Sequence, residues 1–206
     1  MPFVRINDVV LHYRLSGDPS RQRVIAFANS LGTDFRIWDD LVTAFSGDYA
    51  CLQYDKRGHG LSDAPPPPYV MTDHIGDLEG LLDHLGIEDV IVCGDSVGGM
   101  IAQGLAGARP DLVQGLVLCD TGHKIGAEAL WNDRIRAVET KGIAAIAEAI
   151  LERWFSDAYR QPDNAAFAGY RNMLVRTTVE GYAGTCAALR DADLTEVARR
   201  IACPAL

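Results

Sequence analysis

The 206-residue sequence predicts an α/β fold built on a mostly parallel sheet. Segments with apolar residues at helical spacing, such as 34–45 and 72–86, alternate with short apolar runs. These runs are nearly continuous, which predicts strands covered on both faces. The four runs are residues 24–28, 49–54, 89–94 and 115–120. Because strands alternate with helices along the chain, parallel pairing is favoured.

The connecting segments carry turn and cap signals. Residues 3–13 alternate apolar and polar side chains around Asn7-Asp8, which predicts a β-hairpin. Either Thr33 or Asp34 is expected to cap the helix that follows. Thr72 is predicted to cap the helix over 72–86, which ends at Gly86, and Pro65–Pro68 forms a stiff loop.

The pattern changes after His123. Helical stretches such as EALWNDRIRAVETKG and GIAAIAEAILERWF follow, and no strand is predicted before about Arg190. We therefore expect a core over residues 1–122, a helical cap over 123–190 and a return to the core over 191–206. That last part is predicted to hold an amphipathic helix at 194–201 and the first steps of a strand at 203–206.

Composition disfavours two classes of partner, nucleic acid and an anionic membrane. The formal net charge is −9, whereas a nucleic-acid-binding protein usually carries a basic face. The same acidity disfavours an anionic membrane surface as a partner. The N-terminus lacks a signal-peptide pattern, and no window approaches the about 18 apolar residues of a membrane span, so a cytoplasmic protein is expected. Five cysteines without a CxxC pair predict free thiols rather than disulfides or a zinc site.

One motif carries catalytic chemistry. Residues Gly94-Asp95-Ser96-Val97-Gly98 fit G-x-S-x-G, between a predicted strand and a predicted helix. This context is typical of a nucleophile elbow, a tight turn that holds a serine hydroxyl clear of the sheet edge. The helix N-terminus favours developing negative charge, and the Val97 N–H is placed to bind an oxyanion. The alternative is a Gly-Ser turn without chemistry.

A second oxyanion donor is expected from the loop after residues 24–28. By position, the amide of Leu31 is the candidate, and Asn29 and Ser30 would shape the loop. The alternative is a polar loop that only caps the next helix, and both interpretations can hold together.

The glycine-rich loop YDKRGHGLS, residues 54–62, lacks the phosphate-binding pattern G-x-x-x-x-G-K-[ST]. We predict a structural turn in which Asp55, Arg57 and His59 satisfy one another. A catalytic His59 is the alternative.

Taken together, the elbow, the loop NSLGTDFRIW and the loop YDKRGHGLS resemble the α/β-hydrolase fold. The segments HKIGAEALWNDRI, ERWF and GYAGTCAALRDADL are similar to 3-oxoadipate enol-lactonases. The resemblance implies that Ser96 is the nucleophile and that the amides of Leu31 and Val97 form the oxyanion hole. It also implies a small lactone substrate that bears a carboxylate, and neither a metal nor an organic cofactor.

A carboxylate substrate calls for a cation in the cap. Trp131 and Arg134 are spaced i, i+3, so they share a helix face, and the guanidinium of Arg134 suits a carboxylate. Lys124 is a second option, and Asn29 and Ser30 complete the expected substrate-binding set. The alternatives are a solvated Arg134 and a Trp131 that only packs the cap on the core.

The general base is the missing part. The resemblance implies an aspartate and a histidine after two later strands, which would lie beyond Leu206. Asp120 and His123 are the internal alternatives, whereas the expected positions of the other histidines make them poor bases (His12, His74 and His84).

Two interpretations follow. The chain could be a fragment whose acid, base and last strands come from a C-terminal partner polypeptide, and its unpaired sheet edge favours this view. Alternatively it is non-catalytic and serves as a ligand-binding or interaction module. A related esterase acting on another small carboxylate ester is the rival enzymatic function.

Overall fold

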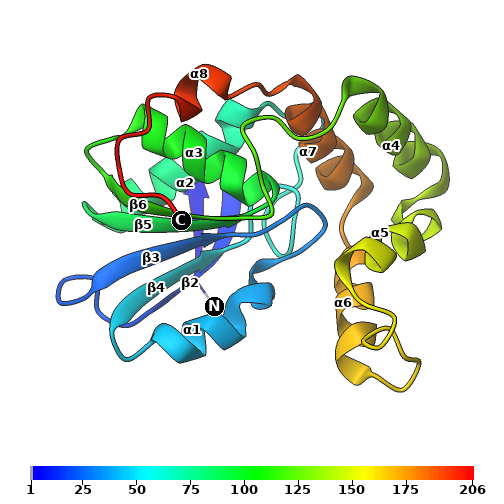
Figure 1. Ribbon diagram of the computed structural model, residues 1–206, viewed down its shortest axis with the longest axis horizontal. Helices are drawn as coiled ribbons and strands as arrows, with labels where there is room; N and C mark the ends of the chain where they lie inside the picture. Colours follow the sequence, from blue (N-terminus) through cyan, green and yellow to red (C-terminus); the bar gives the residue numbers. More distant parts are fainter. Residues whose placement is uncertain (1) are drawn as a thin grey trace.

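The computed structural model describes residues 2–206 and contains a six-stranded sheet in the order β1-β2-β4-β3-β5-β6 (Figure 1). The strands are β1 (Phe3–Ile6), β2 (Val9–Ser16), β3 (Arg23–Ala28), β4 (Tyr49–Tyr54), β5 (Val90–Asp95) and β6 (Val113–Cys119). Strands β4, β3, β5 and β6 pair in parallel, and the β1–β2 hairpin joins β4 antiparallel. The predicted hairpin and the mostly parallel α/β sheet are confirmed.

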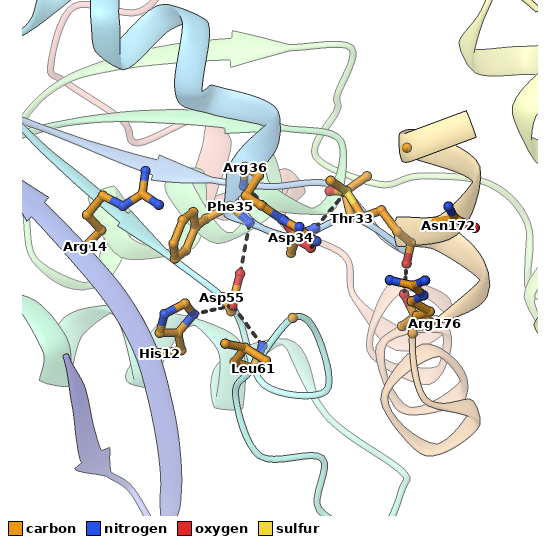
Figure 2. A pocket seen from close by; sticks show the side chains of 14 residues that line it. His12, Arg14, Thr33, Asp34, Phe35, Arg36, Asp55, Leu61, Asn172 and Arg176 are labelled. Atoms are coloured by element: carbon orange, nitrogen blue, oxygen red, sulfur yellow. Dashed lines mark hydrogen bonds and ion pairs between the residues drawn. The ribbon is translucent and has the colours of Figure 1, made fainter. Parts of the chain in front are cut away.

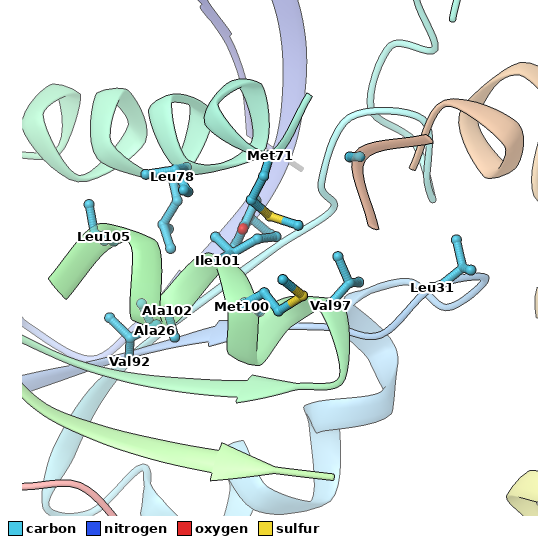
Figure 3. Close-up of a cluster of buried hydrophobic side chains, with 14 of the residues drawn as sticks. Ala26, Leu31, Met71, Leu78, Val92, Val97, Met100, Ile101, Ala102 and Leu105 are labelled. Atoms are coloured by element: carbon cyan, nitrogen blue, oxygen red, sulfur yellow. The ribbon is translucent and has the colours of Figure 1, made fainter. Parts of the chain in front are cut away.

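Helices cover both faces of this sheet. Helix α1 lies on one face and helices α2, α3 and α8 lie on the other (Figure 1). The helices of the core are η1 (Phe35–Trp38), α1 (Asp39–Phe45), α2 (Met71–His84), α3 (Val97–Ala108) and α8 (Thr195–Ala198). Figure 3 shows apolar side chains of α2 and α3 packed over Ala26 and Val92 of the sheet. This burial places the start of α3 rigidly at the end of β5.

Residues 123–190 contain helices and no strand. They comprise α4 (Glu128–Lys141), η2 (Ile143–Ala145), α5 (Ala147–Trp154), α6 (Ala165–Val175) and most of α7 (Val179–Asp191). Helices α4, α5 and α6 lie beside one end of the sheet (Figure 1). Helix α7 packs tightly on the core, because a Cβ added at Gly181 would stand 2.0 Å from the carbonyl oxygen of Gly58. The division at residues 122 and 190 stays a prediction.

The sequence predicted which helices form more accurately than it predicted where each helix begins and ends. Helix α2 begins at Met71, so the prediction of Thr72 as its cap is wrong; the carboxylate of Asp73 instead accepts the N–H of Val70. Gly86 follows α2 with φ of 66°, as predicted. Asp34, not Thr33, caps η1 through the N–H of Arg36.

The C-terminal residues return to the sheet. The expected helix over 194–201 shortens to α8, whose four residues span Thr195–Ala198. Residues 204–206 then run parallel to β6, where the N–H of Leu116 donates to Pro204 and the N–H of Leu206 donates to Leu116. The predicted strand start at 203–206 is confirmed. None of the helices within residues 2–206 has the length and apolar character that crossing a membrane requires.

Candidate active site

Ser96 occupies the turn between β5 and α3 in a strained backbone conformation. Its φ and ψ are 55° and −117°, a combination that costs a non-glycine residue about 1–3 kcal/mol. The flanking glycines are required by close packing: a Cβ at Gly94 would stand 2.3 Å from the carbonyl oxygen of Gly98, and one at Gly98 would stand 1.9 Å from that of Ala28. The G-x-S-x-G sequence therefore forms the cramped strand-to-helix turn that it predicts.

Ser96 faces a cavity of about 360 Å³ between the sheet and the cap. The loop after β3 and the ends of β5 and β6 form its floor, and α4, α5, α6 and α7 supply the remaining walls. The residues that line it are Ser30, Leu31, Thr33, Ile37, Asp95, Ser96, Asp120, Trp131, Arg134, Ile150, Arg153, Trp154, Phe155, Tyr170 and Tyr182. The cavity thus joins polar groups from the sheet edge to aromatic and cationic groups from the cap.

The two predicted oxyanion donors lie at this end of the sheet. Leu31 lines the cavity, and Val97 is the first residue of α3, directly after Ser96. Figure 3 shows both side chains at the same end of the buried apolar cluster. Within residues 2–206, neither of the two N–H groups donates to a backbone carbonyl in another part of the chain. The two N–H groups therefore remain candidates for the oxyanion hole.

The loop after β3 is held by its own polar side chains. The side-chain amide of Asn29 donates to the carbonyl oxygen of Thr33 and is fully buried. Asn29 therefore shapes the loop as expected. It does not line the cavity, and its place in the substrate-binding set stays a prediction. Ser30 does line it, next to Leu31.

The cap residues Trp131 and Arg134 both face the cavity. The Trp131 indole N–H donates to the carbonyl oxygen of Ile125 at 2.6 Å, and the ring is buried. The Arg134 guanidinium carbon lies 5.4 Å from the indole ring centre, and its Nη1 lies 3.5 Å from the hydroxyl of Tyr182. Trp131 therefore packs the cap and also contacts the guanidinium of Arg134. The contact of Arg134 with a substrate carboxylate stays a prediction.

The structure places Lys124 away from the Ser96 cavity. It is exposed, pairs with Asp193 at 3.0 Å and does not line the Ser96 cavity. Sequence spacing could not show this, because Lys124 precedes α4 and points toward the segment after α7. The second cation of the cavity is Arg153 of α5, in the ERWF segment.

Two carboxylates share the cavity with these cations. Asp95 precedes Ser96, and Asp120 directly follows β6 with φ of 41°, at the sheet edge that the sequence predicted. Burial raises the pKa of Asp95, and the negative charge of Asp120 raises it further. The cavity can therefore hold a proton on Asp95 more readily than an exposed carboxylate could.

No histidine is among the residues that line the cavity. His123, the internal alternative for the base, is exposed and lies outside the lining. Its backbone carbonyl accepts the N–H of Leu194. The structure therefore gives no support to His123 as the base.

The loop over residues 54–62 is structural, and the predicted mutual pairing is present in one contact only: the His59 Nδ1–H donates to the carbonyl oxygen of Arg57 at 3.2 Å. Asp55 accepts from the ring of His12 at 2.8 Å and from the N–H groups of Phe35 and Leu61, as Figure 2 shows. These groups border a separate cavity of about 610 Å³ between the core and α6. Asp55 therefore ties the hairpin, η1 and its own loop together, and it lines this cavity rather than that of Ser96.

The side chains of Arg57 and His59 also have partners outside that loop. Arg57 forms a bidentate ion pair with Asp77 of α2, at 2.6 and 2.7 Å. His59 accepts the N–H of Gly32 at 3.0 Å, beside the predicted oxyanion loop. Burial holds the pKa of His59 well below its usual value, so the ring stays neutral and keeps this acceptor. A catalytic His59 is not supported, because the ring does not line the Ser96 cavity.

The fold and this geometry define the class of protein. A family model described as alpha/beta hydrolase fold matches residues 24–163. The chain belongs to the α/β-hydrolase family.

Curated relatives narrow the likeness to one group within that family. The chain is 36% identical over 200 residues to 3-oxoadipate enol-lactonase 2 of Acinetobacter baylyi, covering 97% of this chain and 74% of the relative. It is 34% identical over 189 residues to 3-oxoadipate enol-lactonase 1 of the same organism, covering 91% of this chain and 70% of the relative.

A solved structure agrees with these relatives. The enol-lactonase of Burkholderia xenovorans superimposes with a TM-score of 0.95 at 38% identity, over 99% of this chain and 79% of that one. The resemblance drawn from the cap segments is confirmed.

Proposed function

We propose that this protein is a serine hydrolase that opens a small carboxylate-bearing lactone of the 3-oxoadipate enol-lactone type. One observation carries the proposal: Ser96 stands in a strained elbow beside two available main-chain N–H groups, on a cavity whose cap side holds arginines. The enol-lactonase relatives support the substrate class.

The mechanism follows from this placement. The Ser96 hydroxyl loses its proton to a base as its oxygen bonds to the lactone carbonyl carbon. The N–H groups of Leu31 and Val97 bind the resulting oxyanion. The ring C–O bond then breaks, and the leaving enol oxygen becomes a ketone after proton transfer to carbon. Water hydrolyses the acyl-enzyme and releases 3-oxoadipate, so the reaction needs neither a metal nor an organic cofactor.

We propose further that the base is carried by polypeptide outside these 206 residues, as the C-terminal part of the same fold. The support is the cavity lining, which holds no histidine. A serine hydroxyl is a weak nucleophile at neutral pH without a base. Mixing the chain with such a C-terminal part is expected to raise lactone hydrolysis, and full turnover by residues 1–206 alone would contradict this placement.

A substrate comparison tests the reaction. With the base supplied, 3-oxoadipate enol-lactone is expected to be hydrolysed with a kcat/KM at least about tenfold above that of its methyl ester, because only the free acid pairs with a cap arginine. Hydrolysis is followed by the loss of enol-lactone absorbance. An equal kcat/KM for acid and methyl ester would contradict the proposed substrate class.

A second candidate is an esterase for a less charged substrate. Asp95 and Asp120 line the same cavity and would oppose an anion near the serine. A preference for the methyl ester in the same comparison would favour this function. Failure of Ser96 to react with a fluorophosphonate, with and without the C-terminal part, would leave only a ligand-binding module.

Replacing Arg134 with methionine tests the proposed carboxylate contact. Methionine keeps much of the packing on Trp131 but removes the charge. The KM for the lactone is expected to rise about tenfold or more with kcat nearly unchanged, because a charge-assisted hydrogen bond formed in the ground state is lost. Steady-state kinetics measures both constants.

Arg136→Met is the matched control, because Arg136 is exposed on the same helix and its nearest carboxylate oxygen, on Asp133, is 3.9 Å away. Its KM should equal that of the unmodified protein. An unchanged KM in Arg134→Met would contradict a contact between Arg134 and the substrate carboxylate. Arg153 would then be the remaining arginine of the cavity lining that could make this contact.

A further inference from the structure

The peptide group between Ser30 and Leu31 contains both a proposed oxyanion donor and a carbonyl that is held by other residues. Its nitrogen carries the N–H that we propose as an oxyanion donor, and its carbon carries the Ser30 carbonyl. In a trans peptide, these two bonds point in opposite directions. Whatever holds the carbonyl therefore also aims the N–H.

The Ser30 carbonyl is held by three donors. The Lys56 ammonium nitrogen lies 2.6 Å from the carbonyl oxygen, the Thr33 hydroxyl lies 3.0 Å from it and the Thr33 N–H nitrogen lies 3.3 Å from it. The next peptide along the chain is held as well, because the Gly32 N–H donates to the ring of His59. Lys56 and His59 come from the same loop, so that loop fixes two successive peptides of the oxyanion loop.

Lys56 is an unusual residue to find here. It is 1% exposed, and no carboxylate within residues 2–206 comes within 4.0 Å of its nitrogen. Burying an ammonium group without a direct counter-ion is costly, so a buried lysine normally has a specific partner. The partner here is the one carbonyl whose peptide carries the proposed donor.

Hydrogen bonds in a chain polarise one another. A cation that pulls electron density onto the Ser30 oxygen makes the Leu31 N–H a stronger donor. We infer that Lys56 is a positioning residue that orients and polarises the Ser30–Leu31 peptide so that its N–H binds the oxyanion. This inference rests on the proposed function through the role given to the Leu31 N–H.

Three aspartates and two histidines surround the Lys56 ammonium group and influence its pKa. The charged or titratable groups that face it are Asp34, Asp55, Asp95, His59 and His74. Burial lowers the pKa of Lys56 to about 7, against the raising influence of the three aspartates. Burial also holds the pKa values of both histidines well below the usual value, so they titrate in a lower pH range than Lys56 does.

The test reads the peptide directly by NMR on the 206-residue chain. The ¹⁵N shift of Leu31 and the carbonyl ¹³C shift of Ser30 are followed from pH 5.5 to pH 9. In the unmodified protein both shifts are expected to titrate with one midpoint near the Lys56 pKa of about 7. In Lys56→Met this titration should vanish, and both signals should move in the direction of a weaker hydrogen bond at the Ser30 oxygen.

Lys56→Gln separates position from charge, because glutamine keeps a neutral N–H donor. It should retain a Ser30 carbonyl shift nearer to the unmodified value but should not titrate. Lys141→Met, a lysine-to-methionine change at an exposed position of α4, should leave the titration intact. A titration that persists in both Lys56 variants would overturn the inference, and Lys56→Gln serves alone if the methionine variant does not fold.

Reactivity of Ser96 distinguishes this inference from the proposed function. With the base supplied, Lys56→Met is expected to lower kcat about tenfold while KM changes less than twofold, since the peptide acts on the oxyanion and not on bound substrate. Equal kcat values in the two proteins would overturn the inference while the function stands. No fluorophosphonate adduct in either protein would instead overturn the proposed function, and the NMR titration would still report the Lys56 contact.

Discussion

Replacing Ser96 with alanine is expected to reduce lactone hydrolysis by roughly 10⁴-fold or more, because the reaction loses its nucleophile and the acyl-enzyme cannot form. No other hydroxyl among the cavity-lining residues sits on the elbow between β5 and α3. Ser30 and Thr33 line the same cavity but belong to the loop after β3. Hydrolysis with the base supplied gives the fold-change, and intact-protein mass spectrometry after fluorophosphonate treatment gives the adduct.

Ser156→Ala provides the control. Ser156 is exposed after α5, outside the cavity, and its loss should change neither the rate nor the adduct. An adduct of unchanged mass yield in Ser96→Ala would show that another side chain is the nucleophile. That result would contradict the proposed function, because the elbow would then have no chemical role.

The parts of the fold that could be predicted are those with local signals. The run over residues 89–94 is apolar and continuous because β5 is buried on both faces between β3 and β6. Glycine is required at positions 94 and 98, because the Cβ of any other residue type would overlap neighbouring backbone atoms. This requirement can be recognised in the sequence. Periodicity and close backbone approach therefore leave marks that a single sequence retains.

Partners that lie far apart in sequence left no such mark. The charged side chains of the loop YDKRGHGLS were predicted to pair with one another. In the structure, Arg57 pairs with Asp77 on α2, and Asp55 pairs with His12 on β2. Lys124 and Arg153 carry the same type of charge, and only the packing of α5 places Arg153 in the cavity. The burial of Lys56 could not be predicted from the sequence either, since a lysine in a glycine-rich loop is normally solvated.

The dependence of Ser96 on its backbone leads to the second large effect. Gly98→Ala is expected to lower the free energy of unfolding by about 3 kcal/mol and to reduce the rate of Ser96 modification by more than about 100-fold. The added Cβ would stand 1.9 Å from the carbonyl oxygen of Ala28, so the first turn of α3 must move away from β3. That movement shifts the Val97 N–H relative to Leu31, and a misplacement of about 1 Å is enough to cost such a factor.

Gly47→Ala is the matched glycine-to-alanine control, because a Cβ at Gly47 meets no atom within 4 Å. Chemical denaturation and the rate of fluorophosphonate adduct formation are measured on both variants under conditions where each remains folded. If Gly98→Ala were as stable and as reactive as Gly47→Ala, α3 could shift without disturbing the serine. The reactivity of Ser96 would then not depend on the tight contact between α3 and β3, and the geometric argument for two main-chain donors around one hydroxyl would fail.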